Sequence, residues 1–334
     1  MTTNPLNHQD RRDFTRKITL GLVGLGLINP ATSSARQHLP LSKTFKGVDR
    51  FYEIVRKAQT GRWQTLPMGQ RVMAFAKEFH RVPYVGFTLE IDDRIESPSA
   101  NMVGLDCWTF FEIALGFARM IEFPRQSYTP SNLLSEIEWT RYRGGVCNGN
   151  YLDRIHYLAE WFFEAEARGI ATDITRELGH SVRLKDRAIQ EMTILWKSYR
   201  YLANNPDLRA PMARHEERVS KLPVYYIPRE KVHLVEPKLQ AGDVLGIVTR
   251  HDGGFCSHVG LLHRGEDKIA RLMHASRNYK KVVIDKSISG YLNHYSSHLG
   301  LMVGRPLPRA KAIVNRDQYL TNIRRLTGMR NVGP

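Results

Sequence analysis

One cysteine stands where a helix is expected to begin. Cys107 follows Asp106 and opens an apolar segment, 107–121, in which Gly116 is the only glycine or proline. The unpaired backbone N–H groups at a helix N-terminus favour negative charge, which would lower the pKa of a thiol placed there. The same groups could donate hydrogen bonds to an oxyanion. Cys107 is therefore a candidate nucleophile; the alternative is a small apolar side chain buried in a core.

Two histidines could complete this chemistry. His258 lies in a mostly apolar run, 255–262, that is typical of a strand, and His274 lies on the next expected strand. Adjacent strands bring such side chains within hydrogen-bonding range. We expect His258 to act as general base for Cys107, and His274 to be the third catalytic group, which holds the tautomer of His258. The alternative is two histidines that make ordinary hydrogen bonds at strand ends.

The other two cysteines carry weaker signals. Cys147, Cys256 and Cys107 make an odd number of thiols, so at least one stays unpaired. Cys256 comes two residues before His258, and on a regular strand it would point to the same face. It does not begin a helix, and we rank it below Cys107 as a nucleophile.

A metal site is not expected. The three cysteines share no C-x-x-C spacing. His215 is followed by two glutamates but lacks a second histidine four residues later. His258 and His263 are five residues apart on one strand and hence point to opposite faces. The sequence therefore predicts neither a metal nor a cofactor.

The elements that must position these residues change character along the chain. Apolar spacing and end signals predict helices over 48–58, 68–79, 107–121, 152–168, from Pro130 to before Gly144, and over most of 180–222 with a break at 204–206. Short β-branched or apolar runs predict strands over 224–227, 244–249, 258–263, 269–275, 282–284 and 299–303. Helices first and strands later favour an α+β domain over alternating βαβ units.

The amino end is typical of an export signal. Arg11 and Arg12, with Phe14 two residues later, precede an apolar stretch, 18–28, and small residues follow at 33–35. The paired arginines resemble the twin-arginine signal, so we expect the twin-arginine export machinery as a partner and the periplasm as the destination. The stretch is too short to span a bilayer, and no stable membrane anchor is expected. The alternative is an amphipathic amino-terminal helix.

The charge of the chain is strongly positive. The formal net charge is +16, and the basic residues are spread through segments of mixed sign. A nucleic-acid-binding protein would show a basic stripe or a known module, and neither is present. We therefore expect no nucleic acid as partner; attraction to an anionic cell envelope fits the charge.

The motifs together resemble a known superfamily. Asp106-Cys107-Trp108-Thr109-Phe110, Gly242-Asp243-Val244, Ser257-His258-Val259-Gly260 and Met273-His274-Ala275 follow one another as in the NlpC superfamily of cell-wall cysteine hydrolases. Pro83-Tyr84-Val85 with Thr88-Leu89-Glu90, Arg141-Tyr142-Arg143-Gly144, Arg154-Ile155-His156-Tyr157 with Trp161, and Asp173-Ile174-Thr175 are similar to its N-acetylmuramoyl-L-alanine amidase-like branch. The resemblance covers about Val48 to Pro306.

The resemblance implies a fold and a set of site residues. The fold is a papain-like α+β core, in which the Cys107 helix packs on an antiparallel sheet that bears both histidines. A helical insertion at about 125–222 would build a substrate groove. The expected oxyanion or substrate-binding residues are Tyr84, Asp106, Trp108, Arg141, Arg143, Asp153, Arg154, His156 and Ser257. For each of these, a purely structural role remains the alternative.

The resemblance also implies a domain division and a function. The expected parts are a signal peptide at 1–35, a tail at 36–47, a catalytic domain at 48–306 and a C-terminal extension at 307–334. We expect an exported monomeric hydrolase that cleaves an amide in peptidoglycan or muropeptide fragments, between N-acetylmuramic acid and L-alanine. The alternatives are a stem-peptide endopeptidase or an acyltransferase on the same scaffold, and a non-catalytic cell-wall-binding module.

Overall fold

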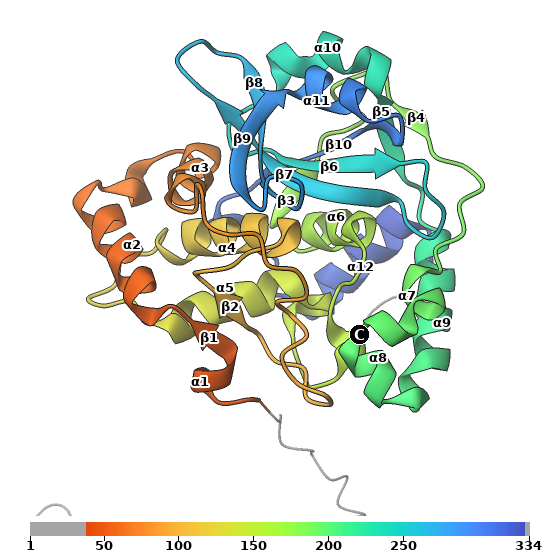
Figure 1. Cartoon of the computed structure of the whole chain (residues 1–334), viewed down its shortest axis with the longest axis horizontal. Helices are drawn as coiled ribbons and strands as arrows, with labels where there is room; N and C mark the ends of the chain where they lie inside the picture. Colours follow the sequence, from red (N-terminus) through yellow and green to blue (C-terminus); the bar gives the residue numbers. More distant parts are fainter. Residues whose placement is uncertain (1–37, 331–334) are drawn as a thin grey trace, which may run out of the picture. The chain divides into compact units, whose positions relative to one another are not determined.

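An eight-stranded sheet lies between two groups of helices in the computed structural model, which describes residues 38–330 (Figure 1). The expected signal peptide lies outside the described residues. The helices are α1 (Leu41–Thr44), α2 (Val48–Thr60), α3 (Met68–Glu78), α4 (Cys107–Met120), α5 (Pro130–Arg141), α6 (Leu158–Ala167), α7 (Glu191–Ile194), α8 (Arg200–Asn204), α9 (Arg209–Ser220), α10 (Val232–Val235), α11 (Ile288–His294) and α12 (Arg316–Thr327). The strands are β1 (Phe45–Lys46), β2 (Ala100–Asn101), β3 (Ala171–Asp173), β4 (Val182–Arg183), β5 (Tyr225–Pro228), β6 (Val244–Thr249), β7 (Cys256–Arg264), β8 (Ala270–Ser276), β9 (Lys281–Ser287) and β10 (His298–Pro306).

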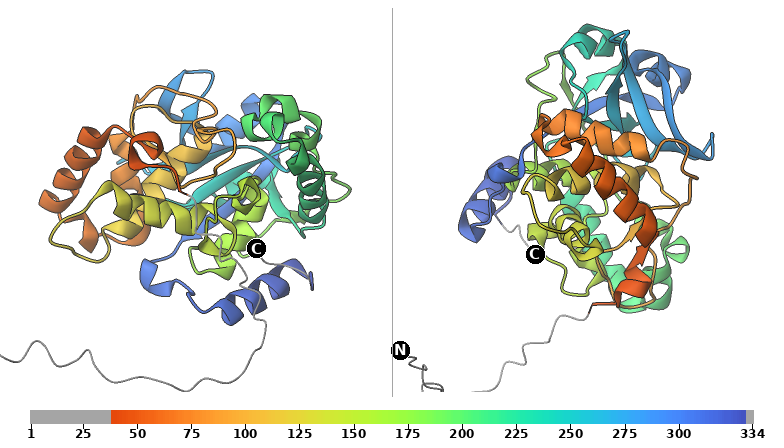
Figure 2. Two further views of the ribbon diagram at one scale, coloured as in Figure 1. Left: turned by 90° about the horizontal axis from the view of Figure 1, so that it is seen from below. Right: turned by 90° about the vertical axis from the view of Figure 1, so that its left-hand side faces the viewer.

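The large sheet is antiparallel throughout. Its strand order is β4-β5-β10-β6-β7-β8-β9, and β3 pairs with β10. Both faces are covered, because α4 and α6 pack on one and α10 and α11 on the other (Figures 1 and 2). Alternate residues of β6 accordingly enter the two hydrophobic cores, as the period of a strand requires. The α+β class and the antiparallel sheet expected from the sequence are confirmed.

Helix α4 is the buried axis of the domain. Asp106 caps it by accepting a hydrogen bond from the Thr109 N–H at 2.8 Å, while the Thr109 hydroxyl accepts one from the Asp106 N–H. The ring of Phe117 stacks on that of Phe75 from α3 at 5.0 Å between centroids. A Cβ on Gly116 would come within 3.1 Å of Leu133 on α5, so the absent side chain lets the two helices approach closely. Cys107 is thus held at the end of a rigid element that packs on β7 and β8.

Some local expectations need correction. The helix expected over 152–168 begins only at Leu158, because residues just before it pair with the 141–142 segment: the Ile155 N–H donates to the Arg141 carbonyl at 2.9 Å. The stretch 180–222 breaks after α8, at Asn204, as expected, but it contains β4 and its first α-helix, α7, begins only at Glu191. Within the segment expected as a tail, β1 pairs with β2, and Phe45 is buried in the core.

The C-terminal extension also packs on the domain. Tyr319 of α12 donates a hydrogen bond to Glu164 of α6 at 2.8 Å, and Ile323 is buried beside Ala167. Among residues 38–330, no helix is long and apolar enough to cross a membrane.

Candidate active site

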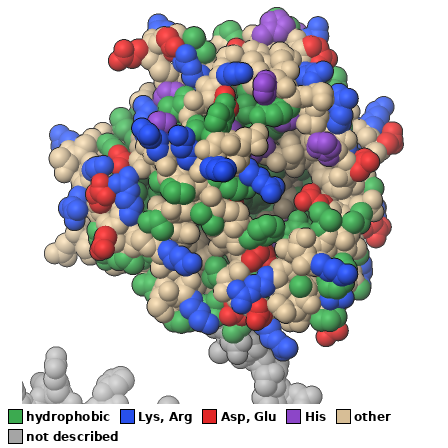
Figure 3. Space-filling view, in the orientation of Figure 1, with side chains coloured by type: hydrophobic (Ala, Val, Ile, Leu, Met, Phe, Trp, Pro, Cys, Tyr) green, Lys and Arg blue, Asp and Glu red, His purple; other side chains and the backbone are tan. Residues whose placement is uncertain are grey.

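Cys107 opens onto a cavity of about 600 Å³. The cavity lies between the start of α4, the beginning of β7 and the helical insertion, whose α7 and the Tyr199 that precedes α8 line it. Figure 3 shows a hollow near the centre of one face, with basic and histidine side chains along its edge. His258 lines the same cavity, so the expected nucleophile and the expected base face one space.

A chain of hydrogen bonds extends behind His258. Its Nε2 lies 2.6 Å from Nδ1 of His274, and Nε2 of His274 lies 3.4 Å from Oδ2 of Asp285 on β9. The carboxylate accepts a hydrogen bond from Nε2–H of His274, which leaves Nδ1 of that ring as an acceptor. The Nε2–H of His258 therefore donates to His274, and Nδ1 of His258 stays unprotonated as the basic atom. This is the tautomer that a general base needs.

Burial sets the resting charges of Cys107 and His258. It raises the pKa of the Cys107 thiol to about 12, and the nearby Asp106 carboxylate adds to the rise. Backbone N–H groups of Val259, Trp108 and Cys107 act in the opposite direction but are outweighed. Burial also lowers the pKa of His258 well below its usual value. The expectation that the helix start makes Cys107 a thiolate is therefore wrong, because desolvation exceeds the effect of the helix end. The resting pair is a thiol and a neutral imidazole.

Four expected site residues surround Cys107. Tyr84 is half-buried on the cavity wall, where burial and the nearby Cys107 and Asp106 raise the pKa of its hydroxyl. Trp108 lines the cavity, with its indole N–H directed to Glu112 at 3.4 Å. Asp106 caps α4 and also accepts from the Thr88 hydroxyl at 3.4 Å. Ser257 lies exposed at the cavity edge.

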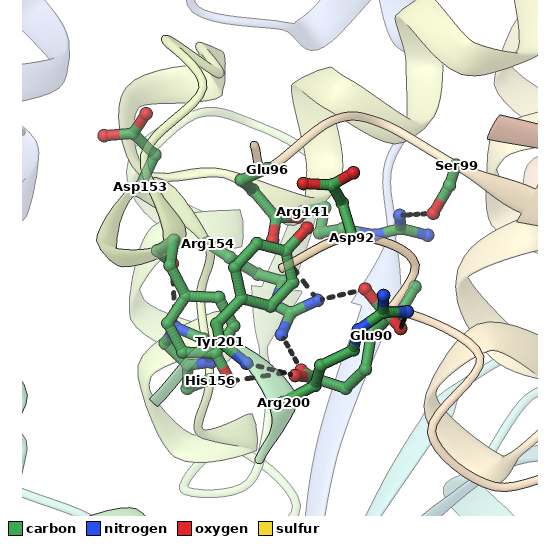
Figure 4. Close-up of polar contacts among 12 residues, drawn as sticks. Glu90, Asp92, Glu96, Ser99, Arg141, Asp153, Arg154, His156, Arg200 and Tyr201 are labelled. Atoms are coloured by element: carbon green, nitrogen blue, oxygen red, sulfur yellow. Dashed lines mark hydrogen bonds and ion pairs between the residues drawn. The ribbon is translucent and has the colours of Figure 1, made fainter. Parts of the chain in front are cut away.

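Two of the expected substrate-binding arginines lie elsewhere. Arg141 is fully buried, and its Nε donates to Glu112 at 2.8 Å and its Nη1 to Ser99 at 3.3 Å (Figure 4). Arg143 is buried against the Arg154 and Leu152 carbonyls. Neither side chain lines the cavity, so the structure does not bring them together with Cys107 as expected. Their guanidinium groups are used to satisfy buried acceptors inside the domain.

Of the remaining expected residues in the insertion, two line the cavity and one does not. Arg154 and His156 line the cavity, but Nη2 of Arg154 is already bound to Glu90 at 2.6 Å, and Nε2–H of His156 donates to the Tyr151 carbonyl at 3.0 Å (Figure 4). Asp153 accepts hydrogen bonds from the backbone of its own turn and does not line the cavity. Glu90 also accepts from the Tyr201 N–H, so it ties the insertion to the loop before α4.

The structure adds site residues that the sequence did not indicate. Asp285 completes the histidine chain, although no local motif marks it. Phe87 is 64% exposed at the cavity, and its ring lies 6.4 Å from that of Tyr199. Its φ of 58° is unusual for a bulky side chain, and such strain is typical of functional sites. Arg277 lines the cavity just after the strand that carries His274.

The cysteines are all free thiols. Cys147 is buried, with its Sγ 3.5 Å from the Glu96 carbonyl. A bulge at the start of β7 pairs Cys256 with Val248 while His258 pairs with Ile247. Cys256 therefore points to the opposite face from His258, unlike the expectation for a regular strand. Within residues 38–330, no group of three or more His, Cys, Asp or Glu side chains is arranged to hold a metal ion.

A family comparison now bears on this geometry. The family model described as N-acetylmuramoyl-L-alanine amidase-like matches residues 74–299, which contain both histidines, Cys107 and Asp285. The chain belongs to this family. No curated protein matches it. The amidase-like segment thus spans α4, the insertion and most of the sheet, whereas α2 and α12 lie outside it.

Solved structures agree with this assignment. An N-acetylmuramoyl-L-alanine amidase from Bacteroides uniformis is 29% identical with a TM-score of 0.64, and the alignment covers 72% of this chain and 99% of that one. A Bacteroides fragilis protein that carries the name of a xylanase is 30% identical with a TM-score of 0.62, over 70% and 99% of the two chains. A Legionella pneumophila protein of the family model DUF1460 is 18% identical and shares the fold, with a TM-score of 0.59 over 78% and 96%. The family is that of amidase-like cell-wall hydrolases, with peptidoglycan as its substrate class.

Proposed function

We propose that this protein is a cysteine amidase that hydrolyses the bond between N-acetylmuramic acid and L-alanine in peptidoglycan or its fragments. One observation carries the proposal: Cys107 and His258 line one cavity, and His274 and Asp285 extend from the imidazole in a hydrogen-bonded chain. A thiol, a base and an orienting group are the parts of activated-thiol catalysis. The amidase-like family supports the choice of bond.

The first half of the reaction follows from the resting charges. Nδ1 of His258 takes the proton of Cys107 as the sulfur attacks the lactyl carbonyl carbon. The first N–H groups of α4 have no intrahelical partner, and with the Tyr84 hydroxyl they can donate to the developing oxyanion. The carbon–nitrogen bond then breaks as the imidazolium gives its proton to the leaving nitrogen. The stem peptide departs with a free L-alanine amine, and the muramyl group stays as a thioester.

Water completes the cycle on the same residues. It attacks the thioester carbonyl while His258 takes its proton, and the carbon–sulfur bond breaks. The sulfur regains the proton from the imidazolium, which restores the neutral pair. No metal or cofactor takes part in any of these steps.

The charged groups of the cavity give less support to glycoside hydrolysis. A glycosidase uses two carboxyl groups, one on each side of the scissile bond. Here Glu90 is bound by Arg154, Asp106 caps α4, and Glu191 accepts from the Tyr199 hydroxyl at 3.2 Å. Each carboxylate is already used by a neighbour, which favours the thiol as the reacting group.

We also propose the finer fold assignment and the location. A cysteine at the start of α4, packed on strands that bear both histidines, supports a papain-like core in the NlpC superfamily with a catalytic domain at 48–306. The paired Arg11 and Arg12 before an apolar stretch support twin-arginine export to the periplasm and removal of about the first 35 residues.

Muropeptide digestion tests the proposed function. The mature protein is incubated with purified muropeptides, and the products are identified by mass spectrometry. We expect free muramyl sugar and an intact stem peptide that begins with L-alanine, and no turnover by Cys107→Ala or His258→Ala variants that keep the wild-type circular dichroism. Cys256→Ser is the matched control and should stay active, because Cys256 points away from His258.

Other outcomes assign the protein to another class. A product that begins with the diamino acid would make it an endopeptidase. A new acyl product formed with an added amine would make it an acyltransferase. Binding of muropeptides without any product would leave a wall-binding module. A Cys107→Ala variant that keeps full turnover would refute the mechanism.

A further inference from the structure

The cavity that holds Cys107 is lined by acidic groups that are already satisfied. Glu90 accepts hydrogen bonds from Arg154, Tyr151 and the Tyr201 N–H. The other two carboxylates cap a helix or bind a tyrosine hydroxyl, as described above. None of the three is a free site for a cationic ligand.

Most of the basic groups of the cavity are also engaged. Arg154 is buried and bound by Glu90, with Glu96 at 3.6 Å. Burial keeps the pKa of both His156 and His258 well below the usual value, so both rings are neutral at pH 7. An anionic part of a ligand therefore has no free partner among these residues.

Arg277 differs from all of them. It lines the cavity, its side chain is exposed, and its guanidinium makes no hydrogen bond or ion pair with any residue in the range 38–330. Its charge reaches the cavity wall, since Arg277 lowers the pKa of Tyr84 against the rise caused by burial. It is the one unpaired cation on the wall that the described residues form.

The backbone fixes Arg277 on the Tyr84 side of the site. Arg277 begins the turn between β8 and β9, and the Lys280 N–H donates to the Arg277 carbonyl at 3.3 Å. The Tyr84 N–H donates to the Lys280 carbonyl at 2.9 Å, and the Val282 N–H donates to the Val82 carbonyl at 2.8 Å. These bonds tie the turn to the segment that carries Tyr84, beside the start of α4.

We propose that Arg277 binds a free carboxylate on the peptide side of the scissile amide and so selects substrates that carry one. The proposal rests on the amidase function above. A guanidinium offers a planar pair of N–H donors that matches a carboxylate, and a carboxamide cannot replace both the charge and the two acceptors. That group is the α-carboxylate of the second residue, D-glutamate, which stays free when the side-chain carboxyl carries the rest of the stem peptide.

Paired ligands that differ only at this group test the proposal. The probes are N-acetylmuramyl-L-alanyl-D-glutamate and its α-amide, N-acetylmuramyl-L-alanyl-D-isoglutamine; both keep the γ-carboxylate, so they differ only at the α-carboxyl group. Binding is measured by calorimetry on Cys107→Ala protein, and hydrolysis is measured on protein that keeps Cys107. We expect the acid to bind roughly 10- to 100-fold more tightly than the amide, as for one charge-assisted pair. Arg277→Gln should abolish that preference and leave the affinity for the amide unchanged, whereas Arg277→Lys should keep part of it.

Lys280→Gln is the matched control. It removes one positive charge from the same turn, but Lys280 does not line the cavity, so the preference for the acid should persist. The proposal would be overturned if Arg277→Gln lost affinity equally for both ligands or kept the preference for the acid. It would also be overturned if the protein with Arg277 bound neither ligand. Charge-selective binding without hydrolysis would support it while refuting the amidase function.

Discussion

Replacing Asp285 with asparagine should disable the base through its tautomer, without a change in shape. Oδ1 of Asp285 accepts the Lys286 backbone N–H at 2.7 Å, and Oδ2 accepts Nε2–H of His274 at 3.4 Å. An asparagine must keep its oxygen toward the Lys286 N–H, so its NH₂ group faces His274. That donor forces the proton of His274 onto Nδ1, which then donates to Nε2 of His258. His258 then carries its one proton on Nδ1, and this nitrogen can no longer accept the proton of the Cys107 thiol.

The size of the effect follows from one charge-assisted hydrogen bond. Such a bond contributes about 1.5–3 kcal/mol, and the 3.4 Å distance places this one toward the lower end. The competent tautomer should therefore fall by about 10- to 100-fold, and kcat/KM with it. The same exchange next to the base in serine proteases costs about 10⁴-fold. A smaller loss is expected here because Asp285 acts through a second imidazole.

The assay compares two variants at position 285 on a muropeptide substrate. Asp285→Ala removes the acceptor but forces no donor onto His274, since water can take its place, so it should lose less activity than Asp285→Asn. Thermal unfolding and circular dichroism check that both variants keep the fold. Full activity in Asp285→Asn, or a larger loss in Asp285→Ala than in Asp285→Asn, would refute the tautomer argument.

Three further predictions concern pH dependence, stability and export. Burial lowers the pKa of His258 well below 6.5 and raises that of Cys107 to about 12. The pH profile of kcat/KM should therefore have a plateau that extends below pH 6.5 and should fall only on the acid side. A fall that begins above pH 6.5 as the pH is lowered would contradict the neutral pair. Arg141→Ala should lower the free energy of unfolding in urea by about 3–5 kcal/mol, because it leaves a buried carboxylate unpaired; unchanged stability with weaker substrate binding would return Arg141 to the groove. Changing Arg11 and Arg12 to lysine should keep the protein in the cytoplasm in fractionated cells, and normal periplasmic delivery would exclude the twin-arginine route.

The elements that position the nucleophile could be predicted because their signals are local. The segment 107–121 is mostly apolar, and Asp106 with Thr109 supplies both halves of a capping box. The strands of the sheet likewise follow from short β-branched runs between turn residues. The stretch 152–157 could not be predicted in the same way, because its apolar spacing suits a helix while the Ile155 N–H donates to the Arg141 carbonyl, outside the stretch.

The third member of the histidine chain depends on register, which sequence does not give. His274 pairs with Val283 across β8 and β9, and an irregularity in the same ladder separates Arg271 from Met273. Asp285 reaches His274 only in this register. A one-residue slip would turn it to the other face of the sheet. The local motif around His274 therefore gave no sign of Asp285 as its acceptor, whereas the sequence motifs did indicate both histidines.

The arginines make the corresponding point about charge. Arg141, Arg154 and Arg277 are chemically identical, and the family motifs favoured the first two as substrate ligands. What separates them is whether a carboxylate from another element reaches the guanidinium: Glu112 on α4 reaches Arg141 and Glu90 reaches Arg154. A buried arginine needs such a partner, because an unpaired buried charge is strongly destabilising. An arginine on the cavity wall that no carboxylate reaches keeps its donors for a ligand, and the short turn after the His274 strand places Arg277 in such a position.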